Sequence, residues 1–386
     1  MELVREGSKQ TEVGLIPENW VLKSIEEIAK ITTGGSDTQD RVEDGKYPFF
    51  VRSEKIETIN KYSFNGEAIL TSGDGVGVGK IFHYVNGKFD FHQRVYAIYD
   101  YNFGVDGRYL FYQFSTNFYQ RVMSMTAKSS VDSVRREMIA SMLIPLPPTL
   151  KEQQAIATAL NDVDALISSL DALIAKKKAI KQGAMQQLLT PPSKGGKRLP
   201  GFDGEWEEKK LGEVCNINMG QSPLSSNYNT EGKGLPLVQG NADIKKRKTI
   251  IRNYTSQITK TADKGDIIMS VRAPVGEIAY SAFKCCIGRG VCAIKFDNEF
   301  LYHYLIFKEA SWAKFSTGST FDSINSSQLR SLLIFIPQGE AEQKAIAQIL
   351  SDMDFELEQL EAKKEKYQQI KQGMMQELLT GKTRLV

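Results

Sequence analysis

Two stretches of the chain carry apolar residues at alternating four- and three-residue spacings. Each stretch covers 39 residues, 152–190 and 342–380, which would run about 58 Å as an α-helix. This spacing is the heptad pattern of a coiled coil. A single apolar seam would not be stable alone, so we expect the two helices to pack on each other. The predicted seam residues are Ile156, Leu160, Val163, Ile167 and Leu170 in the first stretch, and Ile346, Leu350, Met353, Leu357 and Leu360 in the second.

The two stretches are copies of one another. They align without a gap at an offset of 190, and 20 of the 39 aligned positions are identical. The match continues upstream, where residues 129–148 align with 319–338 at the same offset. A third match, at an offset of 186, opens each half. It aligns Trp20, Ile25, Glu27, Ile28, Ile31 and Gly34 with Trp206, Leu211, Glu213, Val214, Ile217 and Gly220. Such a repeat indicates one structural unit used twice.

The order of the repeated parts is cyclic. Residues 378–386 resemble 188–202, the link into the second half, so the chain stops where a link back to the first half would begin. We therefore expect a pseudo-twofold arrangement in which the helices pair antiparallel. The predicted boundaries are a first globular domain at 1–148, a helical spacer at 149–190, a second globular domain at 191–338 and a helical spacer at 339–386.

Both globular halves mix short apolar runs with turn signals, which predicts an α+β fold. Residues 109–124 and 299–316 have the pattern of helices. Asn-Gly pairs at 65–66 and 86–87 predict tight turns. The predicted strands are 47–51, 67–72, 80–85, 94–100, 266–271 and 291–296.

Candidate chemistry in the halves is sparse. The segment GDGVGVGK at 73–80 lacks the spacing of a phosphate loop and predicts a glycine-rich turn. The three histidines are scattered, and the four cysteines form no CxxC pair, so we expect reduced thiols and no metal site. No long apolar run or signal core is present, which favours the cytoplasm. The lack of catalytic machinery favours a recognition protein that is not an enzyme and holds no cofactor.

Charge is distributed unevenly between the halves. The whole chain has a net charge of +3. Residues 207–335 hold 17 Lys and Arg against 12 Asp and Glu, whereas residues 21–144 hold 15 of each. A protein that binds DNA alone usually carries a strong basic surface. If this chain reads DNA, partners must supply part of the positive charge.

The repeated motifs resemble those of a known family. Each half has a W-x4-(I/L)-x-E-(I/V)-x2-I-x2-G opening, a variable body, a D-S-(V/I) segment, an (L/I)-I-x-(I/L)-P exit and an E-Q-x-A-I-A-x2-L helix. This order is similar to that of the specificity subunits of type I restriction-modification systems, and it covers nearly the whole chain. The resemblance implies two target recognition domains, each reading one half of a bipartite site in double-stranded DNA. It also implies helices that fix the spacing and dock two modification subunits, which bind S-adenosylmethionine. Motor-nuclease restriction subunits would join them.

Arginine pairs favourably with guanine, and Asn or Gln with adenine, while lysine runs suit phosphates. Because the two halves differ in their variable bodies, we expect an asymmetric DNA site. Each candidate could equally be a solvated surface residue. The candidate DNA contacts are Arg52, Arg94, Lys128 and Arg135 in the first half, and Lys245, Lys246, Arg247, Lys248, Arg252 and Arg272 in the second.

Two other functions fit part of the pattern. A coiled-coil adaptor with two protein-binding arms would explain the repeat but not three shared motifs. A fused methyltransferase would need a cofactor-binding domain, and no segment is free to form one. Gly183 and Gly373, at equivalent helix positions, suggest a close helix approach or a local break, with a plain helix end as the alternative.

Overall fold

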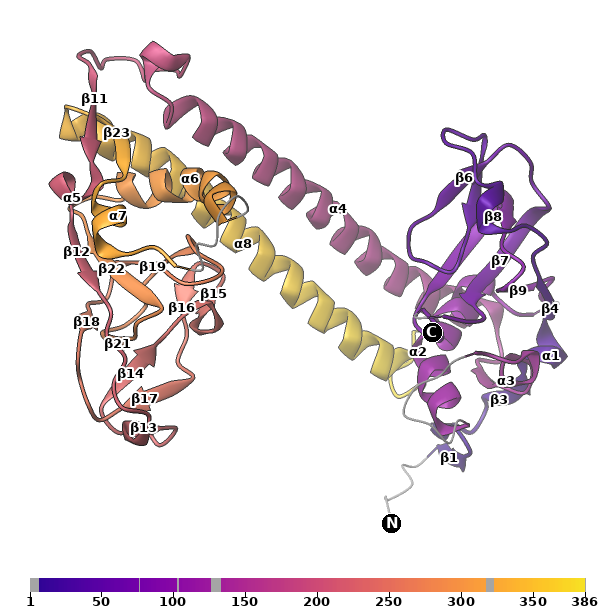
Figure 1. Cartoon of the computed structure of the whole chain (residues 1–386). Helices are drawn as coiled ribbons and strands as arrows, with labels where there is room; N and C mark the ends of the chain where they lie inside the picture. Colours follow the sequence, from indigo (N-terminus) through magenta and orange to yellow (C-terminus); the bar gives the residue numbers. More distant parts are fainter. Residues whose placement is uncertain (1–6, 76, 103, 126–132, 317–322, 386) are drawn as a thin grey trace. The chain divides into compact units, whose positions relative to one another are not determined.

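The structure is a computed structural model that describes residues 7–75, 77–102, 104–125, 133–316 and 323–385. It divides into two compact units, Met1–Asp171 with Lys363–Val386 and Ala172–Ala362. Two long helices contribute to both units: α4 spans Leu150–Leu188 and α8 spans Glu340–Leu378 (Figure 1). Each unit therefore holds one globular arm together with parts of both helices.

The first arm is built on a six-stranded sheet with the order β4-β9-β7-β8-β5-β6. The strands are β4 (Lys30–Thr33), β5 (Tyr47–Phe50), β6 (Glu57–Ile59), β7 (Phe64–Ser72), β8 (Phe82–Phe91) and β9 (Val95–Tyr99). Beyond β4 the chain returns to the end of β8, where Ser36 bridges His92. Gly34 is required there, because a Cβ atom would lie 1.9 Å from the Phe91 carbonyl oxygen.

The prediction of tight turns at the two Asn-Gly pairs is wrong. Both pairs lie inside the long antiparallel ladder of β7 and β8, where Gly66 is directly opposite Gly87. Their φ angles are +149° and +133°, which side-chain-bearing residues rarely adopt. The glycines therefore supply the unusual backbone angles at this point of the β7–β8 pairing, and they do not form a turn.

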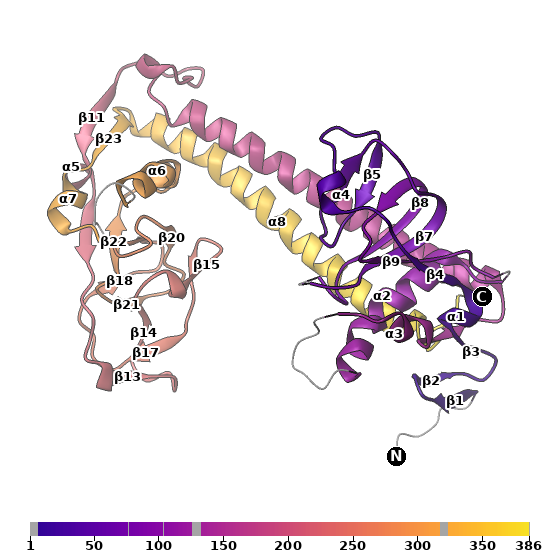
Figure 2. The same cartoon turned by 45° about the vertical axis from the view of Figure 1, so that its right-hand side comes forward.

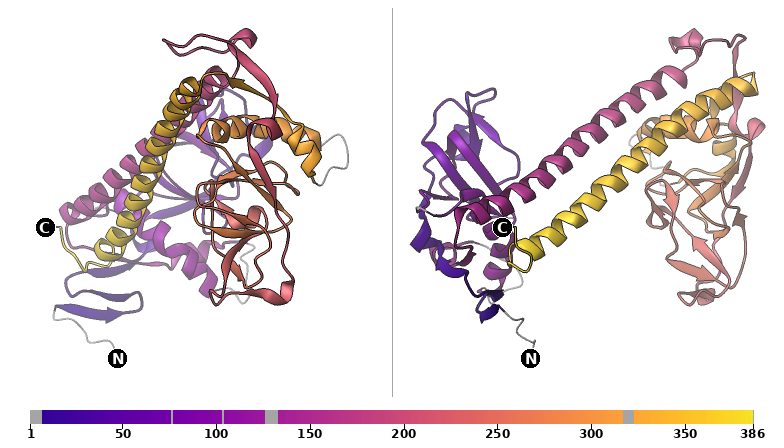
Figure 3. Two further views of the ribbon diagram at one scale, coloured as in Figure 1. Left: turned by 90° about the vertical axis from the view of Figure 1, so that its left-hand side faces the viewer. Right: turned by 180° about the vertical axis from the view of Figure 1, so that it is seen from behind.

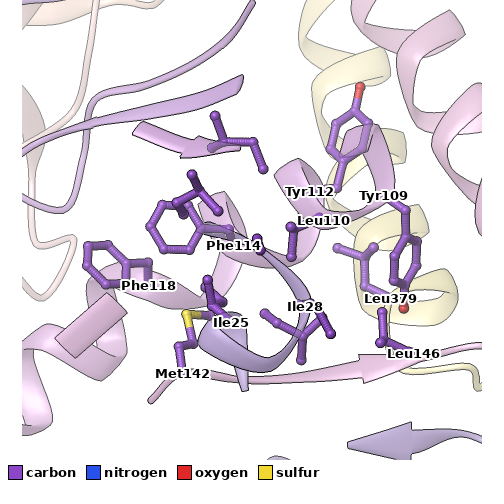
Figure 4. Packing of buried hydrophobic residues seen from close by; sticks show 14 of the residues in the cluster. Ile25, Ile28, Tyr109, Leu110, Tyr112, Phe114, Phe118, Met142, Leu146 and Leu379 are labelled. Atoms are coloured by element: carbon purple, nitrogen blue, oxygen red, sulfur yellow. The ribbon is translucent and has the colours of Figure 1, made fainter. Parts of the chain in front are cut away.

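Helices and two short strand pairs cover the remainder of the first arm. Among them, α2 packs on β7 and β8 through a buried aromatic and aliphatic cluster (Figure 4). Ile156 and Leu160 of α4 belong to this cluster, as does Leu379, which follows α8 and lies beside Tyr109. The elements are β1 (Ser8–Thr11), β2 (Gly14–Pro17), β3 (Val21–Ser24), β10 (Leu143–Leu146), α1 (Ile25–Ile28), α2 (Gly107–Ser124) and α3 (Arg136–Ala140).

The second arm has two sheets, with the orders β12-β22-β19-β20-β16-β15 and β13-β17-β14-β21-β18 (Figure 2). The strands are β12 (Asn216–Met219), β13 (Tyr228–Asn229), β14 (Leu235–Val238), β15 (Ile244–Lys245), β16 (Lys248–Thr249), β17 (Asn253–Thr255), β18 (Thr261–Ala262), β19 (Ile267–Ser270), β20 (Ile278–Tyr280), β21 (Cys285–Ile287) and β22 (Val291–Lys295). The other elements are β11 (Trp206–Lys210), paired with β23 (Leu333–Pro337), and helices α5 (Leu211–Val214), α6 (Phe300–Ser316) and α7 (Ser326–Arg330).

The two arms share one frame with the same strand register. Ser72 of β7 pairs with Val95 of β9, and Ser270 of β19 pairs with Val291 of β22. The parallel pair of Phe50 with Phe91 recurs as Val238 with Ile287. The single strand β8 of the first arm corresponds to β20 and β21 of the second. The predicted α+β class and internal repeat are confirmed.

Within each unit the long helices pair antiparallel (Figure 3). In the first unit Asp164 contacts Lys371 at 2.6 Å and Asp171 contacts Lys364 at 2.5 Å, so one residue number rises as the other falls. In the second unit the ion pair of Lys181 with Asp354 repeats that of Lys371 with Asp164 at the offset of 190. The predicted antiparallel pairing is confirmed.

The E-Q motif at the start of each helix is buried and holds the neighbouring segments. The Glu152 carboxylate forms a bidentate ion pair with Arg384, and the Glu342 carboxylate accepts a hydrogen bond from Arg198 Nε at 3.2 Å. Arg384 follows α8 as Arg198 follows α4. The following glutamines, Gln153 and Gln343, donate their side-chain amides to the carbonyls of Pro147 and Pro337. The cyclic relation of the two links thus extends to individual side chains.

Gly183 and Gly373 lie inside continuous helices. A Cβ atom at either position would meet no heavy atom within 4 Å. These glycines therefore mark neither a close approach of the helices nor a break, and they do not mark a helix end. All three interpretations of Gly183 and Gly373 are wrong.

Candidate nucleic-acid interface

Three loops of the first arm bring polar side chains together. Arg52 follows β5, Asp74 follows β7, and Gln93 and Arg94 form the turn between β8 and β9. Arg52 Nη1 lies 2.9 Å from Asp74 Oδ1, and Arg94 Nη1 lies 2.6 Å from Asp74 Oδ2. The Arg94 side chain remains 62% exposed, compared with 15% for that of Asp74. One half-buried carboxylate therefore orients two exposed guanidinium groups.

The electrostatics of this cluster keep the ion pairs intact at neutral pH. Partial burial acts to raise the pKa of Asp74, but hydrogen bonds from Arg52 and Arg94 hold that pKa below its ordinary value. A cavity of about 180 Å³ adjoins the cluster and is lined by Asp74, Gln93, Arg94 and Tyr96, among others.

A buried histidine shapes the turn that carries Gln93 and Arg94. Burial lowers the pKa of His92, which favours the neutral ring. Its Nδ1 accepts a hydrogen bond from the Arg94 backbone N–H at 3.0 Å, and its carbonyl accepts one from Val95 at 2.9 Å. The Gln93 amide donates to Asp37 Oδ2 at 2.8 Å. The backbone of the turn is thus fixed while both side chains are exposed.

The second arm presents arginine at the corresponding place. Arg289 forms the tip of the turn between β21 and β22, flanked by Gly288 and Gly290, and Arg272 follows β19. Both residues are exposed. Among the residues that the structure describes, neither guanidinium has an ion-pair partner.

The basic run of the second arm forms the β15–β16 hairpin. Its central residues, Lys246 and Arg247, have φ angles of +49° and +61°. Arg247 forms a bidentate ion pair with Glu309 of α6, and Lys248 lies 2.8 Å from Glu358 of α8. These two cations link the hairpin to helices of the second unit, and all four residues from Lys245 to Lys248 are exposed.

The remaining sequence candidates lie elsewhere. Arg252 Nη1 is 3.7 Å from Asp243 Oδ1. Arg135 is exposed just before α3, and Lys128 lies outside the described residues. The predicted residues of the helix seam are buried or half-buried. The buried ones are Ile156, Leu160, Leu170, Ile346, Leu350 and Leu357. The half-buried ones are Val163, Ile167, Met353 and Leu360.

Sequence reasoning missed Gln93, Asp74 and Arg289 at these loops. A usable signal was present, because the match of YAI at 96–98 with CAI at 292–294 extends backward to align Gln93 with Arg289. The strand register then shows that the two loops are equivalent.

The described parts of the chain limit other kinds of site. They contain no group of three His, Cys, Asp or Glu side chains placed to hold a metal ion. Within the same residues, no helix combines the length and apolar character needed to cross a membrane. All four cysteines are free.

Comparison with known proteins identifies the family. The model of the type I restriction modification DNA specificity domain matches twice, at residues 17–182 and 203–372. A Methanocaldococcus jannaschii protein with the provisional name of type I restriction enzyme MjaX specificity subunit is 32% identical, over 98% of this chain and 97% of its own. The MjaVIII specificity subunit of the same organism is 27% identical, over 96% of this chain and 94% of its own.

Solved structures agree on the fold. The S subunit of a type I restriction-modification system from M. genitalium superposes with a TM-score of 0.70 at 17% sequence identity, covering 93% of this chain and 96% of that one. With the family model matched in both halves, the chain belongs to the type I restriction-modification DNA specificity subunits.

Proposed function

We propose that this chain selects the DNA site of a type I restriction-modification complex without being catalytic itself. Each arm reads one half of an asymmetric bipartite site in double-stranded DNA, and α4 and α8 set the spacing. Two modification subunits dock on the helices and supply S-adenosylmethionine and methyl transfer, and motor-nuclease subunits join them for cleavage. The family assignment supports the recognition role.

The observation that carries this proposal is a shared frame with different exposed side chains. The arms repeat the same strand register, yet Gln93 and Arg94 of one correspond to Arg289 and Gly290 of the other. Two arms that bound the same half-site would present the same side chains to it. Unlike arms on one frame therefore favour an asymmetric site over a palindrome.

Mapping of methylated bases tests the proposal. Cells without a resident type I system would express this chain with its cognate modification subunit, and cells with the modification subunit alone would be the control. We expect a new methylated motif with two unlike specified parts around an unspecified spacer. If a complex forms but no motif appears, the chain does not select DNA, and the adaptor alternative explains the repeat.

A further inference from the structure

The turns at Gln93 and Arg289 have the same backbone hydrogen bonds. The His92 N–H donates to the Phe50 carbonyl at 2.9 Å, as the Gly288 N–H donates to that of Val238 at 2.8 Å. The turns close with Val95 donating to His92 at 2.9 Å and Val291 donating to Gly288 at 3.1 Å. Gln93 and Arg289 therefore occupy the same position on the two arms.

The neighbouring loop is equivalent in the same way. Gly73 donates to the Arg94 carbonyl at 2.8 Å, and Val271 donates to that of Gly290 at 2.9 Å. Asp74 forms an isolated bridge with Ser133, and Arg272 forms the same bridge with Ser323, 190 residues later. Asp74 and Arg272 are thus counterparts, so the frame is kept while the charge at this position is reversed.

The backbone at these loops is fixed by close packing. A Cβ atom on Gly290 would lie 2.0 Å from the Gln239 carbonyl oxygen, and one on Gly73 would lie 2.8 Å from that of Arg94. The side chains at the tips are nevertheless exposed. A rigid backbone with variable exposed tips suits direct readout, because base discrimination depends on accurate placement of hydrogen-bond donors.

The exposed side chains at the tips of these turns are of the residue types that can discriminate between bases. Arginine binds the O6 and N7 atoms of guanine through two hydrogen bonds, and glutamine binds the N6 and N7 atoms of adenine. The first arm offers Gln93 and Arg94, and the second offers Arg289 and Arg272. Asp74 is a positioning residue, because it holds Arg94 and Arg52 at 2.6 and 2.9 Å.

The basic hairpin of the second arm is a weaker candidate for this role. Arg247 is paired with Glu309 and Lys248 with Glu358. The segment between β5 and β6 in the first arm is also too short to hold a matching hairpin, with 6 residues at 51–56 against 14 at 239–252 between β14 and β17. An element present in one arm cannot be the reader common to both.

We propose that the turn at His92–Arg94 and the turn at Gly288–Gly290, each with its neighbour Asp74 or Arg272, are the base-reading elements of the two arms. This inference rests on the proposed function. It assigns guanine recognition to Arg289 in the second arm and adenine recognition to Gln93 in the first.

Two reciprocal exchanges, Arg289→Gln and Gln93→Arg, test the assignment in the full chain with its modification subunit. Methylated-base mapping would give the motif for each variant. For Arg289→Gln we expect one guanine of one half-site to lose about 5- to 150-fold in discrimination, the range for one bidentate pair. Gln93→Arg should change one position of the other half-site. Each variant should leave the opposite half-site unchanged.

Matched controls lie at the other end of the equivalent strands. Lys233 and Lys46 are exposed and precede β14 and β5, whereas the turns contact the carboxyl ends of those strands. Lys233→Ala and Lys46→Ala should keep both half-sites. Thermal melting would establish that every variant folds. If Arg289→Gln melts early, Arg289→Lys replaces it, since lysine keeps the charge but lacks the two-pronged geometry.

The outcomes separate the two proposals. If the parent chain directs no motif, the proposed function fails. If the parent directs a motif and folded turn variants leave both half-sites unchanged, the proposed function stands and the turns are not the readers. A uniform loss of methylation without a change of motif would also overturn the assignment, because it indicates phosphate contacts.

Discussion

Gly183 and Gly373 show that equivalent residues in a repeat need not have a structural task. Both lie inside helices with open space where a Cβ atom would stand. Because a helix-interior glycine costs about 1 kcal/mol relative to alanine, we expect Gly183→Ala and Gly373→Ala each to raise the free energy of unfolding by about 0.5–1 kcal/mol. Urea unfolding of the full chain measures this. Gly34→Ala, which would clash with the Phe91 carbonyl, should instead destabilise the protein.

His303 makes the stability of the second unit depend on pH. Burial, with a smaller effect of Lys181, lowers the pKa of His303 to about 3, and its Nε2 lies 2.8 Å from Ser351 Oγ. Asp354 Oδ2, at 3.8 Å from Nδ1, does not offset the burial. The unfolded chain therefore binds a proton near pH 6.5 that the folded chain binds only near pH 3.

The sign of the effect follows from this difference. Stability from His303 is complete above about pH 6.5 and is lost as the pH falls toward 3, by up to about 1.4 kcal/mol per pH unit. Urea unfolding at pH 7 and pH 5 would measure the loss. His303→Gln, which cannot gain a proton in this range, should show a smaller decrease. An equal decrease in the variant would assign the acid sensitivity to other groups.

At the scale of elements, the six predicted strand runs coincide with six of the 23 strands that the structure describes, and both predicted arm helices coincide with α2 and α6. The runs at 47–51 and 291–296 became β5 and β22, because short β-branched and aromatic runs suit a buried sheet. The Asn-Gly pairs misled, because their glycines face each other across β7 and β8, a long-range pairing that no local signal encodes. Gln93 and Arg289 differ in this respect, because the match of YAI at 96–98 with CAI at 292–294 aligns them in the sequence and the strand register agrees.

The segment after α8 contacts the first arm through Leu379 in the buried cluster and through a buried ion pair of Arg384. Glu152 is almost fully buried, and its side-chain partner among the described residues is Arg384. We expect Arg384→Ala to lower the free energy of unfolding by about 3–5 kcal/mol, because an uncompensated charge is left buried. Thermal and urea unfolding would measure this loss.

The second unit offers a matched comparison for this ion pair. Glu342 accepts hydrogen bonds from both Arg198 and Trp206, so Arg198→Ala leaves it one donor and should cost less. The double variant Glu152→Gln/Arg384→Ala should recover part of the loss, because the buried charge is gone. If Arg384→Ala melts like the parent chain, the Glu152–Arg384 ion pair contributes little to the stability of the first unit.

For the whole molecule, the cyclic order of the repeat was readable from the sequence because the two links match. Its physical basis lies in pairs that sequence alone could not assign. Lys371 with Asp164 and Lys181 with Asp354 are one contact used twice, once in each unit. A deletion of the same length at matching positions in both helices should therefore preserve these Asp–Lys pairs, whereas a deletion in one helix should misalign them.

This symmetry gives a test of how the helices act on DNA spacing. Deleting residues 172–178 of α4 and 357–363 of α8 removes one heptad from each helix and keeps both repeated Asp–Lys pairs. Each helix would shorten by about 10 Å, at 1.5 Å per residue. Since DNA rises about 3.4 Å per base pair, we expect the unspecified spacer of the methylated motif to shorten by about three base pairs.

Both half-site sequences should stay the same, because Gln93, Arg94, Arg272 and Arg289 are untouched. Deleting only one heptad would misalign the Asp–Lys pairs and should reduce stability and methylation together. A double deletion that altered the half-sites while leaving the spacer unchanged would show that the helices do not set the spacing.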